Sequence, residues 1–139
     1  TAKSDETMAS MKHAAAEEVD HLAWCDERLS QLGSRPSALN PIFYGLSFAL
    51  GATAGLAGDK WSLGFVAETE RQVEEHLRSH LQEIPESDQK TKSIIKQMII
   101  DEQRHGETAK AAGGKDLPNP IQLAMKAMAN VMKKVTYRV

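Results

Sequence analysis

The 139-residue chain is poor in the residues that several classes of protein require. Cys25 is its one cysteine, which excludes a disulfide framework and a cysteine-based zinc site. Aromatic residues make up 5% of the sequence and strand-type runs of Val, Ile, Thr and Tyr are lacking, which argues against a β-sandwich or barrel. A formal charge of −2 argues against a general nucleic-acid-binding protein. Hydrophobic residues, at 41%, suffice for the core of one domain over residues 1–139.

The two ends of the chain have their own character. The sequence begins at Thr1 with no initiator methionine and no signal peptide, so we expect a fragment or a processed form. Residues 115–139 carry five basic side chains against one acidic side chain, whereas the remainder is acidic. This asymmetry predicts two surfaces with different partners.

Glycine and proline divide the chain into helical segments. We expect helices over residues 7–32, 40–58, 61–84, 88–112 and 121–137. Asn40 followed by Pro41, and Ser87 followed by Asp88, are typical helix starts. The predicted fold class is therefore all-α.

Three of these segments carry an apolar stripe at the 3–4 spacing of one helix face. The stripes are Met11, Ala14, Glu18, His21, Cys25, Leu29 and Leu32; Leu63, Val66, Glu70, Val73, Leu77, Leu81 and Ile84; and Ile95, Met98, Glu102, His105, Ala109 and Ala112. Each stripe should face a bundle core, and each has a carboxylate near its middle. A buried carboxylate costs several kcal/mol unless it is paired or bound to a cation.

The buried polar residues predict a metal centre. Glu18 and His21, and likewise Glu102 and His105, stand three residues apart, so each pair offers an oxygen and a nitrogen ligand on one helix face. Two Glu-x-x-His helices facing helices with one Glu each are the arrangement of di-iron bundles, and Glu70 is such a Glu. Glu and His at this spacing are also common on solvated helix faces, but the apolar stripes favour the metal.

The other histidines and Cys25 have plainer interpretations. His76 and His80 are more typical of the edge of a core than of metal ligands, and His76 is a candidate for contact with a substrate. His13 is expected at the surface. Cys25 is expected to be a small hydrophobic residue of the core.

Two segments suggest contact with lipid. Residues 36–58 contain no charge, yet their glycines and polar residues make them a poor membrane span. They are either a helix packed closely on its neighbours or an exposed apolar helix that touches lipid. The last segment combines a Met-rich face with Lys126, Lys133, Lys134 and Arg138, which is typical of a membrane-surface helix and also of a bundle element.

Several segments together resemble one known family over essentially the whole chain. They are EEVDHLAWC (17–25), NPIFYG (40–45), ETERQV (68–73), DEQRH (101–105) and KVTYR (134–138). These are similar to the demethoxyubiquinone hydroxylases of the bacterial type. The resemblance implies a ferritin-like four-helix bundle with extra apolar and C-terminal helices, and a carboxylate-bridged centre of two iron ions.

The resemblance also assigns residues and a reaction. It implies Glu18, His21, Glu70, Glu102 and His105 as metal ligands and His76 as a catalytic residue near the quinone. A further Glu ligand would belong to a first bundle helix that lies before Thr1, so this chain is expected to hold three ligand helices of four. The implied reaction is O₂-dependent hydroxylation of a polyprenylated benzoquinol in ubiquinone biosynthesis, with electrons from NADH or from the quinol itself.

The resemblance further implies peripheral association with the cytoplasmic face of the bacterial inner membrane. The expected partners are a second copy of the chain or a ubiquinone-biosynthesis complex, and no nucleic acid. Two alternatives remain open at this point. One is a ferroxidase of the ferritin and rubrerythrin kind, and the other is a non-catalytic helical module that binds prenyl lipids. The first leaves the apolar segment unexplained and the second leaves the buried carboxylates without a purpose.

Overall fold

Residues 2–138 fold into five helices that follow one another along the sequence, and the prediction of an all-α fold is confirmed. The computed structural model describes residues 2–138, with the side chains of all but residues 2–4, 48 and 50–55, and contains no strand in that range. The helices are α1 (Ala2–Gln31), α2 (Asn40–Leu56), α3 (Asp59–Glu83), α4 (Gln89–Ala111) and α5 (Asn119–Arg138). The expected boundaries hold to within a few residues except at the start of α1, where no glycine or proline interrupts the helix before residue 7.

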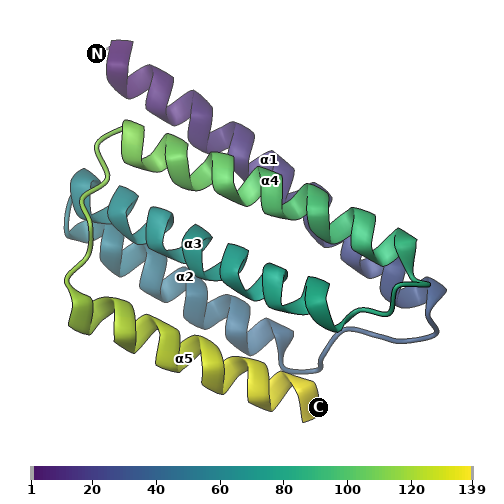
Figure 1. Cartoon of the computed structure of the whole chain (residues 1–139). Coiled ribbons are helices and arrows are strands. Elements are labelled where there is room, and N and C mark those ends of the chain that lie inside the picture. The colour runs from purple at the N-terminus through teal and green to yellow at the C-terminus, as the bar shows by residue number, and fades with distance from the viewer. Residues whose placement is uncertain (1, 139) are drawn as a thin grey trace.

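The helices form layers around α3 and α4 (Figure 1). These two helices run antiparallel and make the most extensive contact in the chain. α1 packs on the far side of α4, whereas α2 and α5 pack on α3. The three helices with predicted ligands are therefore neighbours, and α2 and α5 are the additional apolar and C-terminal helices.

The buried apolar core is small and lies mainly between α3 and α4. Its members are Ala67, Leu77, Ile99, Ala109 and Leu117. No described residue of α5 is buried, and large apolar side chains of α1 such as Leu22 are exposed. The prediction that Cys25 belongs to the core is wrong: Cys25 is exposed, because α1 packs mainly against α4 and this part of its stripe is left uncovered.

The segment between α4 and α5 crosses closely over the start of α3. The backbone N–H of Lys115 donates a hydrogen bond of 3.0 Å to the carbonyl of Lys60, and the Lys115 ammonium lies 5.0 Å from the centre of the Trp61 ring. A Cβ atom on Gly64 would lie 2.0 Å from the carbonyl oxygen of Lys115. Gly64 thus permits the crossing that carries the chain from α4 to the position of α5. Among the described residues, none of the helices combines the length and apolar character that crossing a bilayer requires.

Candidate metal centre

The middles of α1, α3 and α4 bring the predicted ligand residues together. Glu18, Glu70, Glu102 and His105 each offer one ligand atom, and these atoms all lie within 4.8 Å of one another. The Nδ1 atom of His21 lies 3.1 Å from Oε1 of Glu102 and 3.6 Å from Oε2 of Glu18. The five side chains therefore form one group, which we call the Glu/His cluster. That they bind metal stays a prediction.

Helix geometry explains why this grouping follows from the sequence. Residues three apart share a face of a helix, so Glu18 and His21 of α1 point toward Glu102 and His105 of α4. The antiparallel contact of α3 with α4 places Glu70 beside them, with Oε1 of Glu70 4.0 Å from Nδ1 of His105.

The cluster contains polar atoms that lack hydrogen-bond partners. Nδ1 of His21, Nδ1 of His105 and Oε2 of Glu102 are buried and make no hydrogen bond. Such atoms are uncommon in folded proteins because each loses its interaction with water. All three are metal-ligand atoms, and they belong to a donor set of carboxylates and imidazoles that suits iron or manganese. The residues present therefore fit a metal centre.

Two further carboxylates orient the histidines. Nε2 of His21 donates a hydrogen bond of 2.8 Å to Asp101 of α4, and Nε2 of His105 donates one of 3.2 Å to Glu17 of α1. Arg104 joins this outer layer by donating to Glu17 and, over 3.1 Å, to Asp101. A proton fixed on Nε2 leaves the lone pair of Nδ1 directed at the cluster, which is how outer carboxylates prepare histidine ligands.

The sequence interpretation assigned no role to Glu17, Asp101 or Arg104. A signal was nevertheless present, because Glu17 and Asp101 directly precede the Glu of each Glu-x-x-His pair. Glu17 of α1 accepts a hydrogen bond from His105 of α4, and Asp101 of α4 accepts one from His21 of α1. The arrangement is reciprocal, so the two pairs are related by an approximate two-fold symmetry of α1 and α4.

The buried carboxylates of the cluster would be stabilised by a bound positive charge. Burial raises the pKa of Glu102 to about 8, with the neighbouring Glu70 acting in the same direction. Burial also raises the pKa of Glu70, and burial together with the charge of Glu102 raises the pKa of Glu18. Burial opposes a charged ring at His21, but the hydrogen bond to Asp101 prevails and raises its pKa. Bound cations would relieve the repulsion among the carboxylates.

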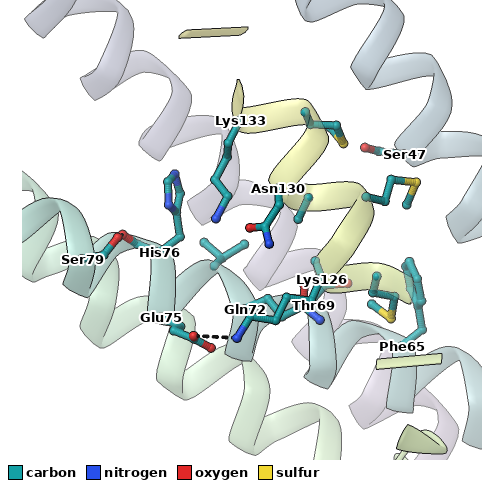
Figure 2. A pocket seen from close by; sticks show the side chains of 15 residues that line it. Ser47, Phe65, Thr69, Gln72, Glu75, His76, Ser79, Lys126, Asn130 and Lys133 are labelled. Carbon is teal, nitrogen blue, oxygen red and sulfur yellow. Dashed lines mark hydrogen bonds and ion pairs between the residues drawn. The ribbon is translucent and has the colours of Figure 1, made fainter. Parts of the chain in front are cut away.

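A separate cavity of about 520 Å³ lies between α3 and α5 (Figure 2). Apolar atoms make up most of its surface, although many of the residues that line it also carry a polar group. The lining residues are Ser47 of α2; Phe65, Thr69, Gln72, Val73, Glu75, His76 and Ser79 of α3; and Met125, Lys126, Met128, Ala129, Asn130, Met132 and Lys133 of α5. An ion pair of 3.1 Å between Glu75 and Lys126 joins the two helices beside it.

The structure places His76 in this cavity, not in the Glu/His cluster. His76 is half-buried, and burial lowers its pKa to about 4, assisted by the charges of His80 and Lys133. Thr69 and Val73, which also line the cavity, stand one residue before and three residues after Glu70 on α3. The cavity and the cluster therefore occupy adjoining faces of the same helix.

Comparison with known proteins gives a consistent result. The family described as "Ubiquinone biosynthesis protein COQ7" matches residues 1–136. Proteins named 3-demethoxyubiquinol 3-hydroxylase match from Pseudomonas fluorescens, at 56% identity over the whole chain, and from Pseudomonas aeruginosa, at 58%. The protein of that name from Alcanivorax borkumensis is 58% identical over 94% of the chain and 59% of its own length. The chain spans 65% of the length of the two Pseudomonas relatives. No solved structure matches the chain.

Proposed function

The chain belongs to the COQ7 family of ubiquinone biosynthesis proteins, and on that premise we propose that it supplies the metal centre of a 3-demethoxyubiquinol 3-hydroxylase. The observation that carries the proposal is the convergence of Glu18, Glu70, Glu102 and His105 within 4.8 Å, with the unpartnered Nδ1 of His21 beside them. A ferritin-like arrangement of α1, α3 and α4 accounts for that convergence. A lipid-binding module gives no reason for burying these side chains.

We infer that the centre holds two iron ions. Glu70, the pair Glu18 and His21, and the pair Glu102 and His105 are the residues that would bind them. Reduced iron bound there would activate O₂ and so supply the oxygen atom that hydroxylation of a quinol ring requires. Electrons would come from NADH or from the quinol itself.

The chain's own residues would prepare the site in three ways. Asp101 and Glu17 hold the protons of His21 and His105 on Nε2, which keeps both Nδ1 atoms available to metal. The side chain of Glu102 is 2% exposed, so its carboxylate meets little water. The cavity beside α3 would receive the substrate ring or its prenyl chain, since its surface is mostly apolar and polar groups such as His76 and Asn130 lie in its wall.

We propose that the protein works at a membrane surface, as a peripheral protein on the cytoplasmic face of the bacterial inner membrane. A polyprenylated substrate resides in the bilayer, and α5 combines exposed apolar side chains such as Leu123 and Val131 with Lys133 and Lys134. Helices of this composition bind anionic lipid surfaces. Flotation with vesicles that contain anionic lipid checks this step: the chain should float, and a Lys133→Glu, Lys134→Glu double variant should float less.

Iron content and hydroxylation together test the main proposal. Glu70→Gln should lower the iron bound per chain and abolish conversion of demethoxyubiquinol to the hydroxylated product, because it removes the one ligand that α3 supplies. Glu107→Gln, at an exposed glutamate of α4, is the matched control and should leave both unchanged. Turnover retained in Glu70→Gln would contradict the proposed function.

A further inference from the structure

His76 and His80 form a second concentration of metal-ligand atoms, outside the Glu/His cluster. They stand four residues apart on α3, and their Nε2 atoms share a hydrogen bond of 3.0 Å. The ring centroids lie 4.3 Å apart in an edge-on arrangement. His80 is exposed and His76 is half-buried in the cavity wall, so the pair can be reached from solvent.

The separation of the two nitrogens suits a metal ion. Zinc–nitrogen bonds are about 2.0–2.1 Å long, so two nitrogens 3.0 Å apart subtend an angle of about 90–97° at a shared ion. That angle is close to the ideal of square-planar and octahedral sites and within reach of a distorted tetrahedral one. Imidazole pairs suit Zn²⁺, Cu²⁺ and Ni²⁺. Consecutive turns of one helix hold the two rings, so binding requires no movement of the backbone.

The charge state of His76 favours a metal as well. A ligand imidazole must be neutral, and the low pKa of His76, which burial causes first and His80 and Lys133 support, keeps this ring neutral at neutral pH. Glu83 acts on His76 with a favourable negative charge. The ammonium of Lys133, which lines the cavity near His76, is the group that opposes a cation (Figure 2).

We propose that His76 and His80 constitute a second metal site that binds a late first-row divalent cation such as Zn²⁺, with water in the remaining positions. The site is separate from the Glu/His cluster, because His76 lines the cavity between α3 and α5 and His80 is exposed to solvent. An ion bound there would occupy the part of the cavity next to Ser79 and would compete with a substrate ring for that space. This last consequence rests on the proposed function, whereas the binding of the ion does not.

Calorimetric titration with Zn²⁺ tests the site directly. Purified protein should bind one more Zn²⁺ per chain than the His80→Gln variant, whatever the Glu/His cluster holds, because both proteins share that cluster. Gln82→Ala is the matched control, since Gln82 lies on the same helix, is exposed and does not line the cavity; it should bind as many ions as the original chain. Equal Zn²⁺ stoichiometry in the original chain and in His80→Gln would overturn the proposal.

Two further measurements identify the ligands and separate this proposal from the proposed function. Lys133→Gln should bind the additional Zn²⁺ more tightly, because it removes the opposing charge; unchanged or weaker binding would contradict the assignment. With Cu²⁺ as the probe, electron paramagnetic resonance should show two coupled nitrogens from this site, and these should be lost in His80→Gln. A chain that lacks hydroxylase activity but keeps the His80-dependent Zn²⁺ would contradict the proposed function alone.

Discussion

Asp101 accepts a hydrogen bond of 2.8 Å from Nε2 of His21 across the contact between α4 and α1. Glu17 stands in the same relation to His105 in the opposite direction, over 3.2 Å. Each helix therefore carries a Glu and a His for the cluster and also the carboxylate that orients the histidine of its neighbour. The proposed metal binding and the packing of α1 on α4 would consequently depend on the same side chains.

Replacing an outer carboxylate should weaken metal binding while leaving all five predicted ligands in place. We expect Asp101→Asn to lower the affinity for Fe²⁺ by about 10- to 100-fold, because the proton on Nε2 of His21 loses its charged acceptor. Glu17→Gln should act similarly through His105. Anaerobic titration with Fe²⁺ measures the effect. Asp26→Asn, at an exposed carboxylate of α1, is the control, and an affinity for Asp101→Asn equal to that of the control would contradict the role assigned to Asp101.

The helices could be predicted because glycine and proline mark their ends and the apolar spacing marks their inner faces. Asp88 illustrates this: it was expected to cap α4, and its side chain accepts a hydrogen bond of 3.1 Å from the backbone N–H of Thr91. The grouping of Glu18, Glu70 and Glu102 followed from their positions on those faces. Most of the correct predictions about the helices and the grouped carboxylates therefore came from the spacing of residues along single helices.

Features that depend on contacts between helices could not be predicted in this way. The pairing of Asp101 with His21 requires knowledge of which residue of α4 lies opposite which residue of α1. The exposure of Cys25 has the same origin, because a stripe is buried only where a neighbouring helix covers it. The position of His76 in a cavity against α5 likewise depends on where the loop after α4 carries the chain.

The stability of the metal-free protein should depend on pH through Glu102. Its pKa is about 8 in the folded chain, mainly because of burial, against an ordinary value of 4.5. The folded state therefore holds this proton more tightly than the unfolded state, so the stabilisation is complete below about pH 4.5 and is lost as the pH rises through about 8. The raised pKa of His21 acts in the same direction.

Urea denaturation in the presence of a chelator measures this dependence. The free energy of unfolding should fall between about pH 5 and pH 8 in the original chain. Glu102→Gln, which cannot ionise, should show a clearly smaller fall, whereas the exposed Glu107→Gln should behave as the original chain does. Burial opposes a charged carboxylate at Asp101, but the hydrogen bond from His21 prevails and lowers its pKa. Asp101 therefore changes the free energy of unfolding only at more acidic pH. A stability that stays constant or rises over this range would contradict the electrostatics described for the cluster.

Filling the cavity between α3 and α5 should impair the proposed hydroxylation without removing metal. Met128→Trp adds a bulky ring to a side chain that lines the cavity, so we expect KM for the quinol substrate to rise while the iron bound per chain stays constant. Ala127→Trp is the control, because Ala127 lies on the same helix, is exposed and does not line the cavity. Equal KM values for the two variants would indicate that the substrate binds elsewhere.

Two glycines should respond in opposite ways to the same substitution. Gly64→Ala should lower the free energy of unfolding by about 1–3 kcal/mol, because the new Cβ would lie 2.0 Å from the carbonyl oxygen of Lys115 and the backbone would have to move. Gly45→Ala should raise it by about 0.5–1 kcal/mol, since Gly45 lies within α2, a Cβ atom added there would meet no described atom within 4 Å, and alanine favours the helix. Thermal or urea denaturation distinguishes the two. If Gly64→Ala were as stable as the original chain, the loop after α4 could not cross α3 as closely as described, and the cavity that α5 forms with α3 would have a different shape.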